Sequence, residues 1–127
     1  MMTAATTRGP TLARLDRPAG PDATVIVLAD AHVDAAHEPG SWKCHETAAD
    51  RLRTGFADAD RIGADAVVVA GDLTRDGDPA SFDAFDDAAE RYGGELCCVP
   101  GNHDVPKDYR DAPSVHAFRD AYTPGVL

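Results

Sequence analysis

Residues 66 to 72 read AVVVAGD, an apolar and largely β-branched run that passes directly into glycine and aspartate. Such a run is typical of a strand buried in a parallel sheet. Similar apolar runs precede and follow it, in ATVIVLAD at 23–30 and in ELCCVPGNHD at 95–104. We therefore predict strands at 23–29, 66–70 and 95–99, and we expect the first two to be covered on both faces.

The segments between these strands have helical periodicity. Residues 46–62 place apolar side chains at helical spacing, and 79–92 form a second helical segment that begins with Pro79 and stops at two glycines. Residues 114–119 also have a helical pattern. Strands that alternate with helices predict an α/β fold, a parallel β-α-β-α-β layer with right-handed crossovers.

The chain has 127 residues, which suits one domain. Residues 1–22 combine Thr, Ala, Pro and Gly without periodicity, so we predict a flexible N-terminal arm followed by a folded portion at 23–127.

Charge and cysteine content restrict the function. A formal net charge of -10 argues against general nucleic-acid binding, which requires patches of Lys and Arg. Three cysteines, of which Cys97 and Cys98 are adjacent, form neither an even disulfide framework nor a spaced metal clip, so a reducing cytoplasm is the simpler compartment. The apolar runs are strand-sized, and we predict no membrane association.

Metal ligands follow each predicted strand. Asp30 and His32 come after the first, Asp72 after the second and Asn102 after the third. Ligands of open α/β sheets gather at the carboxyl ends of the strands. If strand geometry persists, Asp30 and His32 project to the same side and bind one cation, Asp72 bridges two cations, and Asn102 binds the second.

His103 and Asp104 complete the predicted site. Side chains alternate in extended structure, so His103 should point away from the cations, where it can stabilise phosphoryl charge or protonate a leaving alkoxide. Asp104 is a candidate to orient its ring. Two cations clamp a phosphoryl group and acidify a bound water, so we expect phosphoester cleavage by a metal-bound hydroxide.

The order Asp30-x-His32, Gly71-Asp72 and Gly101-Asn102-His103-Asp104 resembles the calcineurin-like metallophosphoesterase family. The extended motifs at 70–74 and 99–106 are similar to its branch of cyclic-nucleotide and other phosphodiesterases. The resemblance implies a small phosphoester substrate and two divalent ions, which can be manganese, iron or zinc. It implies that Asp30, His32 and Asp72 bind the first ion, that Asp72 and Asn102 bind the second, and that His103 assists catalysis.

The family pattern also continues beyond the motifs found here. Family members carry a later strand-end histidine and a Gly-His-x-His element that complete the metal sites and close a four-layer sandwich. His116, the one histidine after His103, lies in a helical pattern. We therefore expect an N-terminal portion of a metallophosphoesterase domain whose C-terminal half is absent. The chain is then either a phosphodiesterase with an incomplete site or a non-catalytic interaction module. Its expected partner is the missing C-terminal half or a second copy of the chain.

Several other residues have more than one interpretation. His37, Cys44 and His45 match no common zinc clip, and solvated loop positions are favoured for them. Cys97 and Cys98 are better explained as strand residues than as nucleophiles. Trp42 either packs on its loop or lines a substrate cleft. Arg75 either approaches a substrate phosphate or pairs with Asp76 or Asp78.

Overall fold

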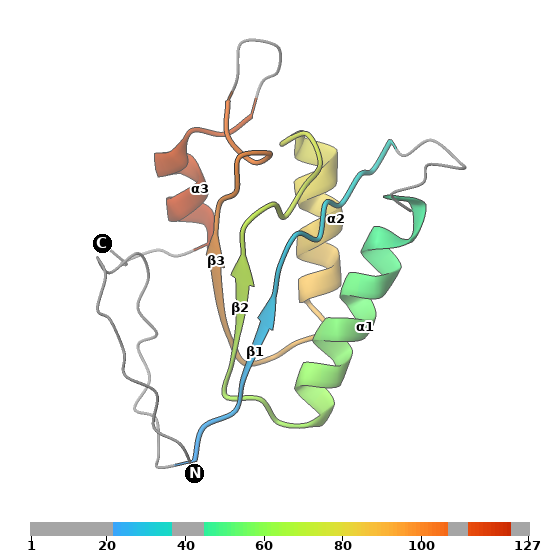
Figure 1. Ribbon diagram of the computed structural model, residues 1–127, viewed down its shortest axis with the longest axis vertical. Coiled ribbons are helices and arrows are strands. Elements are labelled where there is room, and N and C mark those ends of the chain that lie inside the picture. Colours follow the sequence, from blue (N-terminus) through green and yellow to red (C-terminus); the bar gives the residue numbers. More distant parts are fainter. Residues whose placement is uncertain (1–21, 37–44, 107–111, 123–127) are drawn as a thin grey trace.

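The computed structural model describes residues 22–36, 45–106 and 112–122. Three parallel strands pair in the order β1-β2-β3, and helices follow them along the chain (Figure 1). The elements are β1 (Val25–Leu28), the short 3-10 helix η1 (His45–Thr47), α1 (Ala48–Arg61), β2 (Ala66–Ala70), α2 (Pro79–Ala89), β3 (Glu95–Val99) and α3 (Val115–Tyr122). The predicted α/β class and the three parallel strands are confirmed, although β1 is shorter than the predicted 23–29, and each predicted helix is present.

The core lies between the sheet and helices α1 and α2. Val67 and Val69 of β2 are fully buried there, and so are Phe56 of α1 and Phe85 of α2, whose ring centroids lie 6.0 Å apart. Helix α3 lies at the β3 edge of the sheet (Figure 1), and its Phe118 joins the same core. Helices α1 and α2 thus brace the strands from one side.

The opposite face of the sheet is less covered than expected. Ile26 and Leu28 of β1 pack toward the core, whereas Val25 and Val27 are 46% and 63% exposed. The prediction that β1 is covered on both faces is therefore wrong in this structure. A continuous apolar run does not distinguish a doubly covered strand from one whose second face is bare.

Helix boundaries differ from the predictions by a few residues. Helix α1 begins at Ala48, after η1, rather than at residue 46, and α2 ends at Ala89, before the predicted Tyr92. Helix α2 begins as its sequence indicates, because Pro79 occupies the first turn and the Asp78 carboxylate accepts a bond of 3.0 Å from the Ser81 amide. No helix of the described residues is long and apolar enough to cross a membrane.

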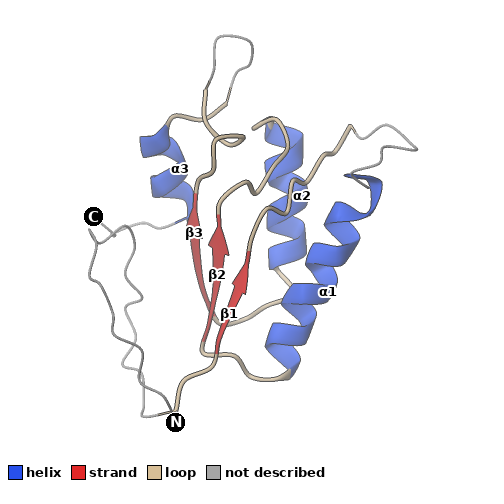
Figure 2. Cartoon of the chain, in the orientation of Figure 1, coloured by secondary structure: helices blue, strands red, loops and turns tan. Residues whose placement is uncertain are grey.

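All three strands point in the same direction (Figure 2), so their carboxyl ends form one edge of the sheet. The loops that leave β1 and β2 stay paired beyond the strands. The amides of Asp30 and Val33 donate to the carbonyls of Gly71 and Leu73 at 3.3 and 3.0 Å, and Val33 and Thr74 form a parallel bridge. These backbone bonds place the predicted ligand segments side by side.

Candidate metal centre

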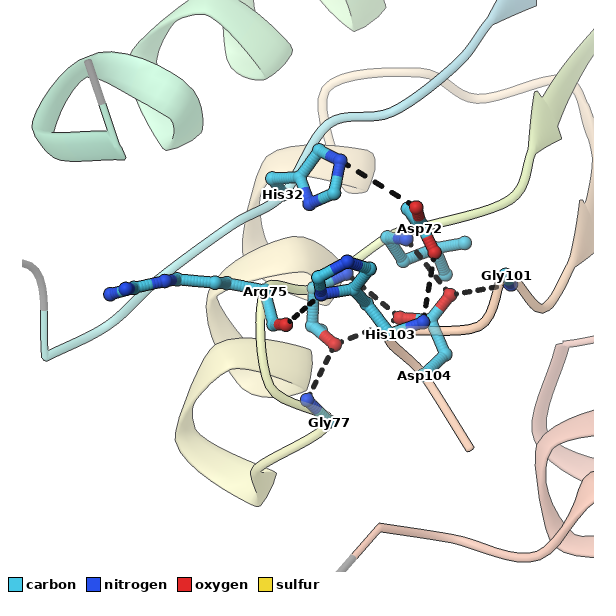
Figure 3. A network of polar contacts seen from close by, with 9 residues as sticks. His32, Asp72, Arg75, Gly77, Gly101, His103 and Asp104 are labelled. Atoms are coloured by element: carbon cyan, nitrogen blue, oxygen red, sulfur yellow. Dashed lines mark hydrogen bonds and ion pairs between the residues drawn. The ribbon is translucent and has the colours of Figure 1, made fainter. Parts of the chain in front are cut away.

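His32, Asp72 and His103 meet at this edge of the sheet (Figure 3). Each offers a ligand atom, and these atoms all lie within 4.8 Å of one another. The residues follow β1, β2 and β3 respectively, so the parallel topology brings together side chains that are far apart in the sequence. A His/Asp/His group is therefore present where the sequence predicts a metal site.

The His32 and Asp72 side chains have a separation that fits a shared cation. The His32 Nε2 atom lies 3.6 Å from Asp72 Oδ2, which is longer than a good hydrogen bond. Imidazole and carboxylate ligands each bind zinc at about 2.0–2.2 Å, so two ligands of one ion are commonly this far apart. The donor set, two imidazoles and a carboxylate, suits zinc, manganese or iron. The described residues thus fit a divalent metal ion.

The backbone at the predicted ligands is unusual. Asp30, His32 and Asp72 have φ angles of 52°, 48° and 47°, and they are the non-glycine residues with positive φ in the described part of the chain. Left-handed backbone at such residues costs about 1–3 kcal/mol and concentrates at functional sites. The loops therefore hold these three residues in a conformation that their local preferences oppose.

The loops that contain Gly71 and Gly101 lie so close together that these two positions require glycine. A side chain at Gly101 would overlap the Asp72 backbone nitrogen and carboxylate, and Gly71 has a φ of 86°. Glycine lets the backbone of the β3 loop approach the Asp72 ligand directly. The His103 amide then donates to Asp72 Oδ1 at 3.0 Å and fixes that carboxylate.

The remaining two predicted ligands lie outside the His/Asp/His group. Asp30 is exposed and lines the same cavity as His32, and Asn102 is exposed in the turn before His103. The predicted persistence of strand geometry from Asp30 to His32 is wrong, because both residues have left-handed backbone. Their roles as ligands stay predictions.

His103 differs from its expected orientation. Its ring does not point away from the site but lies with its centroid 4.9 Å from that of His32, at 84° to it. Side chains alternate only along extended backbone, whereas residues 102–103 form a turn. His103 is thus placed either to bind a cation beside Asp72 or to act on a substrate held there.

Asp104 also has partners other than the expected one. Its carboxylate accepts bonds from the Leu73, Thr74 and Gly101 amides and from the Thr74 hydroxyl, and none of these donors is the His103 ring. The Nδ1 atom of His103 instead lies 2.6 Å from the Arg75 carbonyl oxygen. That carbonyl orients the imidazole, a contact that the residue types alone do not reveal.

A cavity of about 570 Å³ adjoins the group. Its walls combine the apolar residues Leu28, Ala31, Ala48 and Leu52 with Asp30, His32, His45, Arg51, Arg75 and His103. The volume falls within the range of small-molecule sites. A small substrate can therefore lie against the candidate metal ligands.

Asp34 and His45 have roles near the site that the sequence did not predict. Asp34 is buried and accepts a bond of 2.9 Å from Arg75 Nη1, whereas Asp76, one of the predicted partners, is 4.0 Å from Arg75 Nε. His45 is buried, with its ring centroid 6.5 Å from that of His32, so the expectation of a solvated position is wrong. Asp34 lies two residues after the predicted ligand His32, just as His32 lies two residues after Asp30. That spacing is the one sequence feature that could have indicated a role for Asp34.

Other candidates lie elsewhere or outside the described residues. His116 is exposed on α3 and is not a member of the His/Asp/His group. Cys97 and Cys98 are buried strand residues, as predicted, and burial raises the pKa of both thiols. Residues 1–21 of the predicted N-terminal arm, His37, Trp42 and Cys44 lie outside the residues that the structure describes.

Comparison with known proteins agrees with this geometry. The family model for the calcineurin-like phosphoesterases matches residues 23–125. A probable cyclic nucleotide phosphodiesterase of a Synechococcus species is 35% identical over 57 residues, a segment that covers 45% of this chain and 22% of that relative. The match thus spans about a fifth of the relative's length.

Proposed function

Because the chain belongs to the calcineurin-like phosphoesterase family, we propose that it carries the metal-binding part of a phosphoester hydrolase, most simply a phosphodiesterase. One observation carries this proposal. His32, Asp72 and His103 converge at the ends of three parallel strands, with ligand atoms within 4.8 Å of one another. The partial similarity to a probable cyclic nucleotide phosphodiesterase supports the diester preference.

In this proposal, His32 and Asp72 would hold one divalent ion, with Asp30 as a further donor. Asp72 and the side-chain amide oxygen of Asn102 would supply donors for a second ion. Bound divalent cations supply Lewis acidity, which stabilises charge on phosphoryl oxygens and makes water more acidic.

The residues of the chain have separate tasks around that centre. His103, oriented by its 2.6 Å contact with the Arg75 carbonyl, is placed to hold or donate a proton near a bound phosphoryl group. The adjoining cavity receives the organic part of the substrate, with apolar contacts from the α1 side and charge from Arg51 and Arg75. A small phosphoester is the substrate class that these features favour.

Calorimetry and turnover test the proposal together. Manganese should bind the 127-residue chain saturably, and a bis-aryl phosphodiester should be hydrolysed only with the metal present. Asp72→Asn keeps the side-chain shape but removes a charged ligand, so both signals should be lost. Asp87→Asn, an exposed change on α2, should keep both. Undetectable metal binding, or hydrolysis that survives Asp72→Asn, would overturn the proposal.

A second candidate function is a non-catalytic interaction module. The exposed Val25 and Val27 on the sheet favour it, because apolar surface of this kind commonly marks contact with another polypeptide. Another copy of the chain or a further segment of a longer protein would then cover this face. Manganese binding without turnover, together with self-association in sedimentation, would favour this candidate over the enzyme.

A further inference from the structure

Asp104 is fully buried, and each of its carboxylate oxygens accepts two hydrogen bonds. Oδ1 accepts from the Thr74 amide at 2.9 Å and the Thr74 hydroxyl at 2.8 Å. Oδ2 accepts from the Leu73 amide at 3.0 Å. It also accepts from the Gly101 amide at 2.9 Å (Figure 3). The four donors come from two loops that are about thirty residues apart in the sequence.

These donors flank the candidate metal ligands. Leu73 directly follows Asp72, and Gly101 lies two residues before His103. The Asp104 carboxylate therefore ties the loop after β2 to the loop after β3, immediately beside the point where the His103 amide contacts Asp72 Oδ1. A shift of either loop would move Asp72 relative to His103.

We propose that Asp104 is a positioning residue that sets the metal affinity of the site by holding these two loops in register. The inference rests on the proposed metal-binding function and assigns Asp104 no contact with metal or substrate. Residues behind metal ligands commonly change metal affinity by about 10- to 100-fold when they are mutated.

The bonding pattern requires a carboxylate at this position. A carboxylate is an acceptor at both oxygens, whereas an amide presents one acceptor and one NH₂ donor group. Since each Asp104 oxygen faces two donors, Asn at this position would oppose two of them with its own NH₂ group in either orientation. Asp104→Asn should therefore release one side of the connection with almost no change in side-chain volume.

Thr74 links Asp104 to Gly77, in the loop that leads from β2 to α2. Its hydroxyl donates to Asp104 and accepts a bond of 2.9 Å from the Gly77 amide, and the residue is fully buried. Thr74→Val keeps the branched shape and removes both bonds, whereas Thr74→Ser retains the hydroxyl. This pair separates the hydrogen bonds from the packing of the side chain.

The test is manganese calorimetry on the full chain. Asp104→Asn and Thr74→Val should bind manganese about 10- to 100-fold more weakly than the unmodified chain, and Thr74→Ser should stay within about threefold. Phe56→Leu, a core change between α1 and α2, provides a matched loss of melting temperature away from the loops. It should leave the manganese affinity unchanged.

Four outcomes would overturn the inference. They are manganese affinity that is unchanged in a folded Asp104→Asn, affinity that is unchanged in Thr74→Val, an equal loss in Thr74→Ser, and an equal loss in Phe56→Leu. If Asp104→Asn does not fold, the Thr74 pair carries the test. If the unmodified chain binds no manganese, the proposed function fails. Hydrogen exchange at the Leu73 and Gly101 amides then still tests whether Asp104 holds the two loops together. Both amides should lose protection in Thr74→Val but not in Phe56→Leu.

Discussion

Asp30, His32 and Asp72 show how residue type and residue geometry differ in what the sequence reveals. Their identities and positions after predicted strands were enough to predict a metal site, because carboxylates and imidazoles at strand ends suit cations. Their orientation was not predictable. The positive φ angles of 47° to 52° occur where backbone hydrogen bonds join two loops, and no local sequence pattern encodes that long-range pairing.

Asp104 and Arg75 illustrate the same limit through hydrogen bonding. Asp104 adjoins His103 in the sequence, and this proximity suggested a contact with the ring. Burial instead directs the carboxylate to backbone amides, since a fully buried carboxylate requires several donors. The Arg75 carbonyl then contacts the imidazole, a role that is independent of the arginine side chain.

The Arg75 side chain carries a prediction about substrate binding. Its guanidinium donates to the buried Asp34 carboxylate and points away from His103 (Figure 3), and Arg75 is one of the residues that line the cavity. We expect it to contact a part of the substrate remote from the metal, since a fixed guanidinium binds anionic oxygens well. In Arg75→Met, the KM for a phosphodiester should rise about 10-fold while kcat changes less than about threefold.

Steady-state kinetics with manganese measure both constants. Arg119→Met, on the exposed surface of α3, is the matched control and should change neither. A fall in kcat at constant KM would contradict a binding role and would instead connect Arg75 with the position of His103.

Among the elements, the three strands were the most predictable. Strand β2 spans Ala66–Ala70 and β3 spans Glu95–Val99, as the apolar runs indicated. The number of covered faces of β1 could not be predicted from its sequence, because coverage depends on which other segments pack against the sheet. Helix ends were less predictable, since the short η1 replaces the first turn of the expected helix.

The start of α2 is an element whose stability can be measured. The Asp78 carboxylate accepts from the Ser81 amide, and loss of such a cap costs about 0.5–2 kcal/mol. Asp78→Ala should therefore lower the free energy of unfolding by about 1 kcal/mol in urea denaturation. Asp83→Ala, an exposed change on the same helix, should stay within about 0.5 kcal/mol. Equal midpoints for Asp78→Ala and the unmodified chain would show that the cap contributes nothing.

The cysteines of β3 predict a chemical property of that strand. Burial raises the pKa of Cys98 far above its ordinary value, and its neighbour Cys97 adds to the shift. Burial also raises the pKa of Cys97, with a further contribution from Glu95. The protonated thiol dominates below the thiol pKa, and only the thiolate is a good nucleophile. Both cysteines should therefore resist iodoacetamide at pH 8 in the native chain.

Mass spectrometry of the peptide that contains both cysteines measures this reactivity. The same peptide should be alkylated at both thiols after denaturation, which is the control for intrinsic reactivity. Rapid modification of the native chain at either thiol would mean that β3 opens readily or that one thiolate is stabilised.

For the whole molecule, the sheet has one covered and one partly bare face. Helices α1 and α2 protect the Val67 and Val69 side, whereas Val25 and Val27 face outward from β1. In the part of the chain that the structure describes, β1 pairs only with β2. Its other edge therefore presents backbone groups that can pair with a further strand. An apolar face beside an unpaired edge favours association with another polypeptide.

We predict that this face drives self-association of the isolated chain. In sedimentation velocity, the unmodified chain should form dimers as its concentration rises, and Val25→Thr with Val27→Thr should weaken the dimer about 10-fold or more, since burying each methyl group contributes about 0.8 kcal/mol. Threonine keeps the β-branched shape that strands favour, so the melting temperature of the monomer should change little. Val115→Thr is the matched control, because Val115 is 56% exposed on α3 and lies outside this face. A chain that stays monomeric at every concentration, or a dimer that Val115→Thr weakens equally, would contradict the prediction.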